Sequence, residues 1–335
     1  MRLVNQIKKI KKTINRRRLS TKLMGISPNL ALHISPIKSI AIEASSACNI
    51  RCLCCPVGNK AVEGRNMSPG DFANILDLLP PHIKLLSFSH RGDPTMNPRF
   101  PEIVNLAFKR GLETDIYTNG LTLDKYITDL VESGLTSIRI DLDGASEHSY
   151  LNYRIGSNFE RVKSNVRLLV EARSKSKEKF PKKIRIMCVV TAFNENEIPE
   201  IQSMAESLGV DEVLFKTAIT NYGTKFYRDI SLQKGIAPAN KAYRRAKRPK
   251  IFICPALWRG AILYNGDLQI CTADFEGEYV IGNILREKSF EKVFYGKKAR
   301  SIREQIIKQN APLCKTCAVI DKDHFMKGIN RKFAH

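Results

Sequence analysis

The sequence predicts an α/β protein built as a partial, TIM-like (β/α)6 barrel, and three observations lead to this fold class. Between residues 39 and 216, short β-branched or apolar runs alternate with amphipathic segments, which is typical of βα units around a parallel sheet. Six such units occur, too few to close an eight-stranded barrel. With 335 residues, 43% of them hydrophobic, the chain can bury a full core.

The expected strands are rich in β-branched residues and cover 39–43, 84–89, 113–118, 137–143, 183–191 and 212–216. The segments between them carry apolar residues at helical spacing, and the first has Phe72, Ile75, Leu76 and Leu79. Ser68 and Pro69 give this helix a start signal, and Gly209 gives the fifth helix a stop signal. These signals set the limits of the βα units.

The fourth expected strand has one apolar and one charged face. Alternate side chains of a strand point to opposite sides, which separates Ile138, Ile140 and Leu142 from Arg139, Asp141 and Asp143. If the apolar set packs under helices, the charged set lines the barrel. Buried charges are costly without partners, so we expect a polar ligand in the lumen.

Four of the nine cysteines lie in the stretch CNIRCLCC, residues 48–55, directly after the first expected strand. Cys48, Cys52 and Cys55 have the spacing C-x3-C-x2-C, and three thiolates can each bind one iron of a [4Fe-4S] cluster. The fourth iron would then be open to another ligand. Zinc is the alternative, but a structural zinc site needs four ligands and this loop offers three.

The cysteine spacing and the loops after the following strands resemble the radical SAM superfamily over residues 38–216. The resemblance implies that the open iron binds S-adenosylmethionine (SAM), whose reductive cleavage gives a 5'-deoxyadenosyl radical that abstracts a substrate hydrogen. HRGDP (90–94) is similar to the family's Gly-Glu-Pro segment, with an aspartate in place of the glutamate. The resemblance assigns cofactor binding to Gly92, Asp93, Pro94, Asn119, Asp143, Arg154 and Asn194.

Cys54 departs from the family pattern, which usually has an aromatic or apolar residue just before the third cysteine. Choosing Cys54 in place of Cys55 as a ligand would give an unfamiliar spacing. Free cysteine behaves as a small hydrophobe, so we interpret Cys54 as an apolar substitute and not as a ligand.

A second cysteine group follows the barrel segment. Its pattern, C-x11-G-x4-C with Gly266 and a later C-x2-C, resembles the SPASM/twitch extension of radical SAM enzymes in its shorter twitch form. The resemblance implies an auxiliary [4Fe-4S] cluster with four protein ligands, suited to electron transfer; a zinc ribbon is the alternative. The expected ligands are Cys254, Cys271, Cys314 and Cys317.

The expected domain organisation has four parts. A basic extension (1–37) precedes the barrel (38–216), and a connecting segment (217–250) leads to a twitch or SPASM-like domain (251–335). In that last domain we expect a hairpin turning at Asn265-Gly266 and a helix over 289–308.

Side chains expected in the lumen are candidates for substrate binding and catalysis. Tyr117 and Arg139 are candidate substrate ligands, and Asp141 and His90 are candidate acid or base groups. Cys188 is a candidate thiol that returns a hydrogen atom, as in some radical SAM epimerases. Alternation opposes this role, since Cys188 shares a strand face with the apolar Ile184, Ile186 and Val190.

The formal charge of +22 favours an anionic substrate or partner. Residues 1–25 carry nine Lys or Arg and no acid, with Leu3, Ile7, Ile10 and Ile14 at helical spacing. This segment suits an acidic partner, a nucleic acid or an anionic membrane surface, or it is a solvated tail. The chain lacks an apolar run near the ~18 residues of a membrane span and a secretory signal, so we expect a cytoplasmic protein.

The expected function is dehydrogenation (alcohol oxidation) or epimerisation of a polar small molecule such as a sugar, an aminocyclitol or a nucleotide derivative. A flavodoxin- or ferredoxin-like protein is the expected electron donor. One alternative is radical modification of a peptide, although a leader-binding domain would need more than the residues before 38. The other is a zinc-stabilised protein that binds nucleic acid or a membrane.

Overall fold

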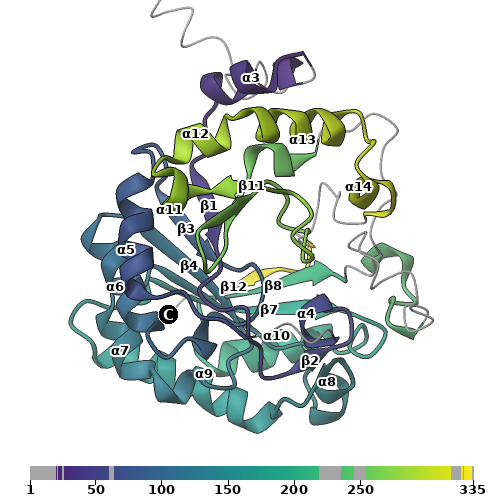
Figure 1. The fold of residues 1–335 in the computed structure, drawn as a ribbon. Helices are drawn as coiled ribbons and strands as arrows, with labels where there is room; N and C mark the ends of the chain where they lie inside the picture. Colours follow the sequence, from purple (N-terminus) through teal and green to yellow (C-terminus); the bar gives the residue numbers. More distant parts are fainter. Residues whose placement is uncertain are drawn as a thin grey trace, which may run out of the picture.

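The structure is a computed structural model that describes residues 20, 22–24, 26–59, 64–218, 235–244, 254–317, 326 and 328–333. Six parallel strands form its centre, in the places that the sequence predicts (Figure 1). They are β1 (Ser39–Ile42), β3 (Leu85–Phe88), β4 (Glu113–Thr118), β5 (Ser137–Asp141), β7 (Lys183–Val190) and β8 (Glu212–Thr217). Because the six strands are parallel, the loops that follow them all lie at the same end of the barrel.

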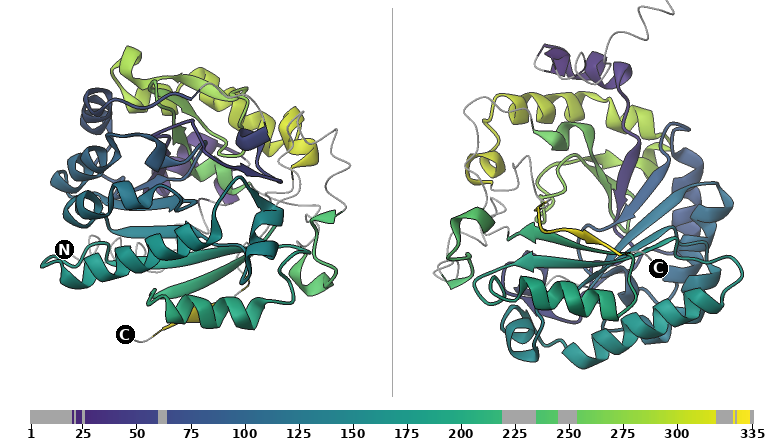
Figure 2. Two further views of the ribbon diagram at one scale, coloured as in Figure 1. Left: turned by 90° about the horizontal axis from the view of Figure 1, so that it is seen from below. Right: turned by 180° about the vertical axis from the view of Figure 1, so that it is seen from behind.

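The helices lie on the outer face of the curved sheet (Figures 1 and 2). Those that follow the strands are α5 (Pro69–Leu78), α6 (Phe100–Lys109), α7 (Ile127–Glu132), α9 (Phe159–Lys175) and α10 (Ile198–Ser207). The predicted start of α5 is confirmed, because the Ser68 hydroxyl accepts a hydrogen bond from the Asp71 amide at 3.0 Å. Apolar side chains of the helices and of the outer strand face form one continuous core.

Strand β5 shows the two faces that alternation predicts. Ile138 and Ile140 are fully buried beneath the helices, whereas the Arg139 and Asp141 side chains keep 21% and 18% of their exposure on the inner face. Asp143 differs from the prediction, because β5 ends at Asp141 and the Asp143 side chain is fully buried. The inner face is thus polar and partly open to solvent.

The C-terminal segment continues the same sheet. Strand β9 (Ala261–Ile262) pairs in parallel with β1, and β10 (Asp267–Gln269) and β11 (Val280–Asn283) follow in antiparallel order. The predicted turn is present, with Gly266 at φ +84° between β9 and β10. At the other edge β12 (Arg331–Lys332), which the sequence did not predict, pairs antiparallel with β8. The whole sheet has ten strands, in the order β11-β10-β9-β1-β3-β4-β5-β7-β8-β12.

The prediction of a single helix over 289–308 is wrong. The segment is divided into α12 (Phe290–Phe294) and α13 (Lys297–Ile307), and α14 (Pro312–Thr316) follows. The break lies at Gly296, where a Cβ would come within 2.6 Å of the Lys292 carbonyl oxygen. Only glycine permits this close approach, so the chain turns there.

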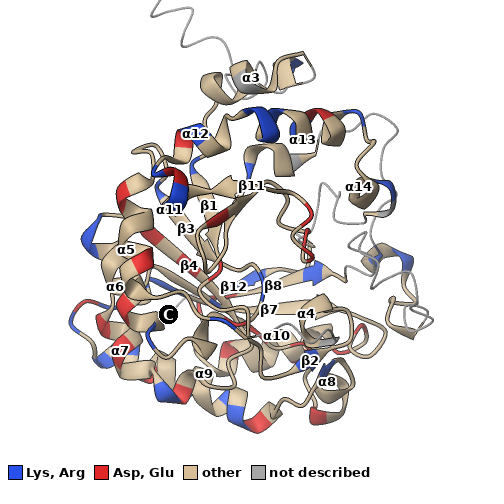
Figure 3. Ribbon diagram, viewed as in Figure 1, with Lys and Arg blue, Asp and Glu red and all other residues tan. Residues whose placement is uncertain are grey.

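Part of the expected basic extension packs on the C-terminal segment. Helix α3 (Pro28–Ile34) lies beside α13, and the Trp258 indole donates to the Ser20 hydroxyl at 3.2 Å. Residues 1–19, which hold the predicted amphipathic basic helix, lie outside the described residues, as do 219–234 and 245–250 of the expected connecting segment. Figure 3 shows further Lys and Arg on α13, mixed with acidic residues on the neighbouring helices.

Among the residues that the structure describes, no helix is both long enough and apolar enough to cross a lipid bilayer.

Candidate active site at the carboxyl ends of the strands

The first cysteine loop starts at Cys48, six residues beyond the end of β1, and is paired with another part of the barrel. A short strand, β2 (Arg51–Cys52), pairs antiparallel with β6 (Arg154–Ile155), and helix α4 (Pro56–Asn59) ends the loop. The Cys55 amide donates to the Cys52 carbonyl at 3.0 Å, which turns the chain between these two thiols. The loop therefore presents Cys48, Cys52 and Cys55 beside Arg154, as a group.

The chemistry of these thiols fits a metal cluster. Burial, with a smaller effect of the nearby Asp93 and Cys55, raises the pKa of Cys48 to about 11. Burial also raises the pKa of Cys52, and the neighbouring Cys55 and Cys48 add to the rise. Cys48 and Cys52, two close thiols whose raised pKa values oppose ionisation, need cations to become thiolate ligands, and iron supplies them. As placed, no three Cys, His, Asp or Glu side chains of the described residues surround one ion, but a cubane binds each thiolate through a separate iron.

Cys54 is more deeply buried than its neighbour Cys55, which packs against the same apolar cluster. Its side chain is 5% exposed and lies in an apolar cluster with Ile50, Tyr153 and Val189. Burial raises the pKa of its thiol to about 12. This placement agrees with an apolar packing role, and that role stays a prediction.

The Gly92-Asp93 segment touches the chain that leads into the cysteine loop. Gly92 has φ +66°, and a Cβ there would lie 2.3 Å from the Ser45 carbonyl oxygen and 2.5 Å from that of Ala47. The Asp93 amide donates to the Ala47 carbonyl at 2.7 Å. The absence of a side chain at Gly92 thus lets this segment approach the residue just before Cys48.

Asp93 connects the loops after β3 and β4. Its carboxylate accepts hydrogen bonds from the Thr118 hydroxyl at 3.0 Å, from the Asn119 amide at 2.7 Å and from Thr95. Burial raises the pKa of Asp93, and these hydrogen bonds oppose that rise. The Asn119 side chain then donates to the Asn49 carboxamide at 2.8 Å, inside the cysteine loop. Pro94 begins the short 3-10 helix η1 (Pro94–Met96) that closes the segment.

Arg154 lies buried between two carboxylates. Its Nε donates to Asp143 at 2.5 Å, and its Nη2 pairs with Asp141 at 3.1 Å. The two carboxylates outweigh the cost of burial and hold the pKa of Arg154 well above its usual value. Its Nη1 forms no hydrogen bond with a described residue, so one edge of the guanidinium remains for the carboxylate group of SAM, the partner that the resemblance implies for Arg154.

The Asn194 side chain connects the segment after β5 to the end of β7 by hydrogen bonds. Its Nδ2 donates to the Asp143 and Val189 carbonyls, both at 2.9 Å, and its Oδ1 accepts from the Thr191 amide at 2.8 Å. The side chain is 1% exposed. The bonds to the Asp143 and Val189 carbonyls use both Nδ2 hydrogens, so a cofactor contact through Nδ2 would break one of them, and the cofactor contact of Asn194 stays a prediction.

Polar side chains of the inner face form a second group below the loops. Arg139 donates to the Tyr117 hydroxyl, lies 4.6 Å from the centre of its ring, and pairs with Asp115 at 3.1 Å. The Lys216 ammonium lies 5.9 Å from the centre of the same ring and forms no ion pair with a described residue. The sequence reasoning missed Lys216, although alternation from Glu212 along β8 would have placed it on the inner face.

Cys188 does not reach this group. Its thiol is fully buried in the main core, on the side of β7 that faces the helices. Burial raises its pKa well above the usual value. The expected role of Cys188 as a hydrogen donor is therefore not supported, because a donor thiol must face the substrate.

His90 lies at the border with the C-terminal segment and not in the lumen. Its ring stacks on Phe275 at 5.9 Å between centroids, and its Nε2 lies 3.1 Å from Nε2 of Gln269. Burial lowers the pKa of His90 to about 3, with a further contribution from Arg91. A histidine that stays neutral and packed in this way is unsuited to the acid or base role that we expected.

The second cysteine group is drawn from three separate segments. Cys254 precedes the 3-10 helix η6 (Pro255–Trp258), Cys271 follows β10, and Cys314 and Cys317 lie in and just after α14. Burial raises the pKa of Cys271 well above its usual value, and Cys254 and Cys317 are close enough to add to the rise. Segments far apart in sequence thus bring thiols together, as an auxiliary cluster requires.

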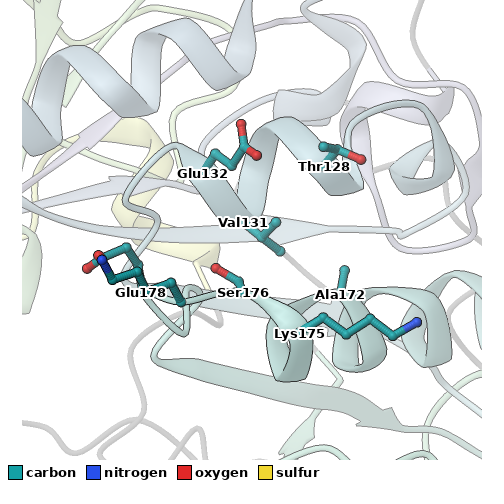
Figure 4. A pocket seen from close by; sticks show the side chains of 8 residues that line it. Thr128, Val131, Glu132, Ala172, Lys175, Ser176 and Glu178 are labelled. Atoms are coloured by element: carbon teal, nitrogen blue, oxygen red, sulfur yellow. The ribbon is translucent and has the colours of Figure 1, made fainter.

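A hollow on the outer surface is remote from these groups. It lies between α7 and the end of α9 and is lined by Thr128, Val131, Glu132, Ala172, Lys175, Ser176, Lys177 and Glu178 (Figure 4). Its mixed charges and its place on the helical layer give it no connection with the cysteine loops.

Two family models match the chain. The model described as the radical SAM superfamily matches residues 42–205, and the one described as an iron-sulfur cluster-binding domain (SPASM) matches residues 254–318. These ranges contain both cysteine groups and the loops after the strands.

Similar curated proteins match part of the chain. A tungsten-containing aldehyde ferredoxin oxidoreductase cofactor-modifying protein of Pyrococcus furiosus is 31% identical over 185 residues, which are 53% of this chain and 51% of that protein. A probable GTP 3',8-cyclase of Methanococcus maripaludis is 24% identical over 176 residues, 52% of this chain and 56% of the relative. The chain thus spans about half the length of these relatives.

Solved structures share the fold at low identity. BtrN in complex with AdoMet and 2-DOIA has a TM-score of 0.53 at 16% identity, covering 84% of this chain and 92% of that one. Streptococcus suis SuiB bound to S-adenosylmethionine has a TM-score of 0.62 at 16% identity, covering 80% and 68%. The anSMEcpe protein with AdoMet and the Cp18Cys peptide has a TM-score of 0.56 at 15% identity, covering 83% and 88%.

Proposed function

Because the chain belongs to the radical SAM superfamily and carries a SPASM iron-sulfur domain behind the barrel, we propose that it oxidises an alcohol carbon of a polar small molecule. These two domains imply a SAM-binding [4Fe-4S] cluster and an auxiliary cluster. Cys48, Cys52 and Cys55 would hold the first, and Cys254, Cys271, Cys314 and Cys317 the second. When bound, these groups supply the radical that takes a hydrogen atom from the substrate and the acceptor for the remaining electron.

One observation carries the choice of reaction. Epimerisation needs a hydrogen donor on the substrate side, and the candidate thiol of Cys188 is buried on the opposite side of β7. Dehydrogenation needs no such donor. It needs only that the substrate hydroxyl lose a proton, and that an electron leave toward the auxiliary cluster.

The inner face offers groups for both substrate binding and proton transfer. Asp141 is partly exposed there and is held by Arg154 at 3.1 Å, so we assign it as the acceptor of the hydroxyl proton. Tyr117, Arg139 and Lys216 would bind polar or anionic substrate groups by hydrogen bonds and charge. Water must be kept from the radical, and the loops on the strand ends would form that cover.

The names of the relatives support a small polar substrate. The cyclase relative is named for GTP, and BtrN was solved in complex with AdoMet and 2-DOIA. A sugar, an aminocyclitol or a nucleotide derivative is therefore the substrate class that we propose. A flavodoxin- or ferredoxin-like protein would supply the first electron.

Peptide modification is the second candidate. It is favoured by two neighbours solved with peptides, SuiB with the precursor peptide SuiA and anSMEcpe with the Cp18Cys peptide. The two candidates differ in the size of the compound that transfers hydrogen to 5'-deoxyadenosine.

The test is anaerobic incubation with reductant, SAM and deuterated candidate substrates. We expect 5'-deoxyadenosine that carries deuterium from one carbon of a small alcohol, together with the corresponding ketone or aldehyde. Deuterium transfer only from a peptide would select the second candidate. Intact SAM under all conditions, in a protein with full iron content, would refute the radical mechanism itself.

A further inference from the structure

The four residues His90 to Asp93 contact segments that lie next to both cysteine groups. Gly92 and Asp93 contact the residues just before Cys48, as the close approach of Gly92 to the Ser45 and Ala47 carbonyls shows. The two preceding side chains, those of His90 and Arg91, point to the C-terminal segment instead. One short loop after β3 thus lies between the two proposed cluster sites.

Arg91 joins the barrel to the C-terminal segment through a buried carboxylate. Its Nε and Nη2 donate to the two oxygens of Glu43 at 2.7 and 3.1 Å, a bidentate pair in which the Glu43 side chain is fully buried. The third nitrogen, Nη1, donates to the Phe275 carbonyl at 3.3 Å. The Tyr264 amide completes the link by donating to Glu43 at 3.2 Å.

His90 makes a parallel link to the loop that carries Cys271. Its ring stacks on Phe275, and its Nε2 lies beside the Gln269 amide. That amide nitrogen also donates to the Cys271 carbonyl at 2.8 Å and to the Asp274 carbonyl at 3.1 Å. The side chains of His90 and Gln269 therefore connect the SAM-binding segment to the backbone of Cys271, an expected ligand of the auxiliary cluster.

The strand pairing gives these links a rigid base. Glu43 is the first residue after β1, and its amide donates to the Ile262 carbonyl of β9 at 2.9 Å. The backbone hydrogen bonds of the sheet are enough to fix β9 and β10 against β1. The loop 271–279 lies beyond these strands, so the sheet does not fix it directly. Contacts of His90 and Arg91 with Gln269 and Phe275 hold that loop in place.

From this network we infer that Glu43, His90, Arg91 and Gln269 are positioning residues that hold the auxiliary-cluster loop at a fixed place relative to the SAM-binding segment. The inference rests on the proposed function for its consequence. Electron transfer from the substrate radical depends on where the auxiliary cluster lies. Loss of the contacts made by these residues should therefore lower product formation while SAM cleavage continues.

The first test uses the charge-balanced double variant Glu43→Gln/Arg91→Gln, because removing one partner would leave a buried charge unpaired. In the anaerobic holoenzyme we expect a several-fold rise in 5'-deoxyadenosine formed per product molecule, and an altered EPR signal of the reduced auxiliary cluster. The matched control is Arg173→Gln/Asp211→Asn. That pair also lies partly buried, at 2.6 Å, but on the helical side of the barrel. The control should leave both readouts unchanged.

A second measurement needs neither turnover nor clusters. Hydrogen exchange of peptides covering 262–279 should be faster in the Glu43→Gln/Arg91→Gln protein than in the wild type or the control. The variant Phe275→Leu, which keeps the ion pair and removes the stacking partner of His90, should give a smaller acceleration. It also serves if the double variant does not fold.

The outcomes separate the two proposals. If the Glu43→Gln/Arg91→Gln protein shows unchanged hydrogen exchange over 262–279 and a wild-type EPR signal, the positioning role of these residues is refuted. This holds even if SAM is cleaved and product is formed. Faster exchange in a protein whose wild type never cleaves SAM supports the positioning role and refutes the proposed function.

Discussion

At the level of single residues, the adjacent thiols of Cys54 and Cys55 differ in burial. Cys55 is half-buried and raises the pKa of both Cys48 and Cys52, whereas Cys54 is buried in the apolar cluster that also contains Cys52. We expect Cys55→Ala to lose the barrel cluster, and hence about half of the iron of a protein with two clusters. Cys54→Ala should keep it. Iron and sulfide analysis of anaerobically purified protein decides between them, and equal iron loss in both variants would contradict the assignment.

Cys188 gives a prediction about the reaction. Its thiol belongs to the core on the helix side of β7. We expect Cys188→Ala to lower stability by about 1 kcal/mol, the usual cost of a small core truncation, and to leave product formation per enzyme intact. Product analysis by mass spectrometry checks this. Loss of product with undiminished SAM cleavage would restore the epimerase alternative.

His90 gives a prediction about pH. Its pKa is lowered to about 3 in the folded chain, while an unfolded histidine titrates near 6.5. Between these values the unfolded chain binds a proton that the folded chain does not, so the free energy of unfolding decreases as the pH falls below 6.5. The loss from this group is about 2 kcal/mol at pH 5 and is nearly absent above pH 7.

The test of this pH dependence compares the wild type with His90→Gln in urea unfolding of the cluster-free protein. The glutamine variant should lose less stability between pH 7.5 and pH 5 than the wild type. Equal losses would mean that His90 is not held neutral in the fold.

At the level of elements, the loop after β3 depends on a glycine for two separate reasons. Gly92 has a positive φ, and its neighbours leave no room for a Cβ. Gly111 has nearly the same angle, φ +68°, but a Cβ at that position would meet no described heavy atom within 4 Å. Substitution of Gly111 therefore tests backbone strain alone, whereas substitution of Gly92 tests backbone strain together with steric clash.

We expect Gly111→Ala to cost about 1–2 kcal/mol, the strain of a left-handed alanine. Gly92→Ala should cost more, and it should also weaken SAM binding because the segment must move away from the cysteine loop. Thermal unfolding and equilibrium binding of SAM to reconstituted protein measure the two effects. Equal effects of the two substitutions on SAM binding would refute the role of close approach at Gly92.

At the level of the whole molecule, the two cysteine groups lie in separate segments, although the barrel strands and β9, β10 and β11 belong to one ten-stranded sheet. Cys271→Ala should remove the auxiliary cluster, lower the iron content by about half, and leave reductive SAM cleavage in place. Product formation should fall, since the electron from the substrate radical has no acceptor. Iron analysis combined with assays of 5'-deoxyadenosine and product tests this. Loss of SAM cleavage in a folded Cys271→Ala protein would show that the barrel site depends on the auxiliary cluster.

Much of the fold and of the metal-binding set could be predicted because it depends on local pattern. Alternation along β5 separates Ile138 from Arg139, and the six parallel strands follow from such runs. Thiols that must bind one cluster from one tight loop have to be close in sequence, so Cys48, Cys52 and Cys55 are visible as a spacing. These features need no knowledge of which segments pair across the molecule.

Long-range pairing was decided only by the tertiary structure. The sequence predicted the hairpin of β9 and β10 but not the pairing of β9 with β1, through which these strands continue the barrel sheet. It assigned His90 to catalysis, whereas the structure stacks the His90 ring on Phe275 of the C-terminal segment. Periodicity records which way a side chain points, but its partner depends on strand order and loop approach, and these are set by burial and hydrogen bonding over the whole chain.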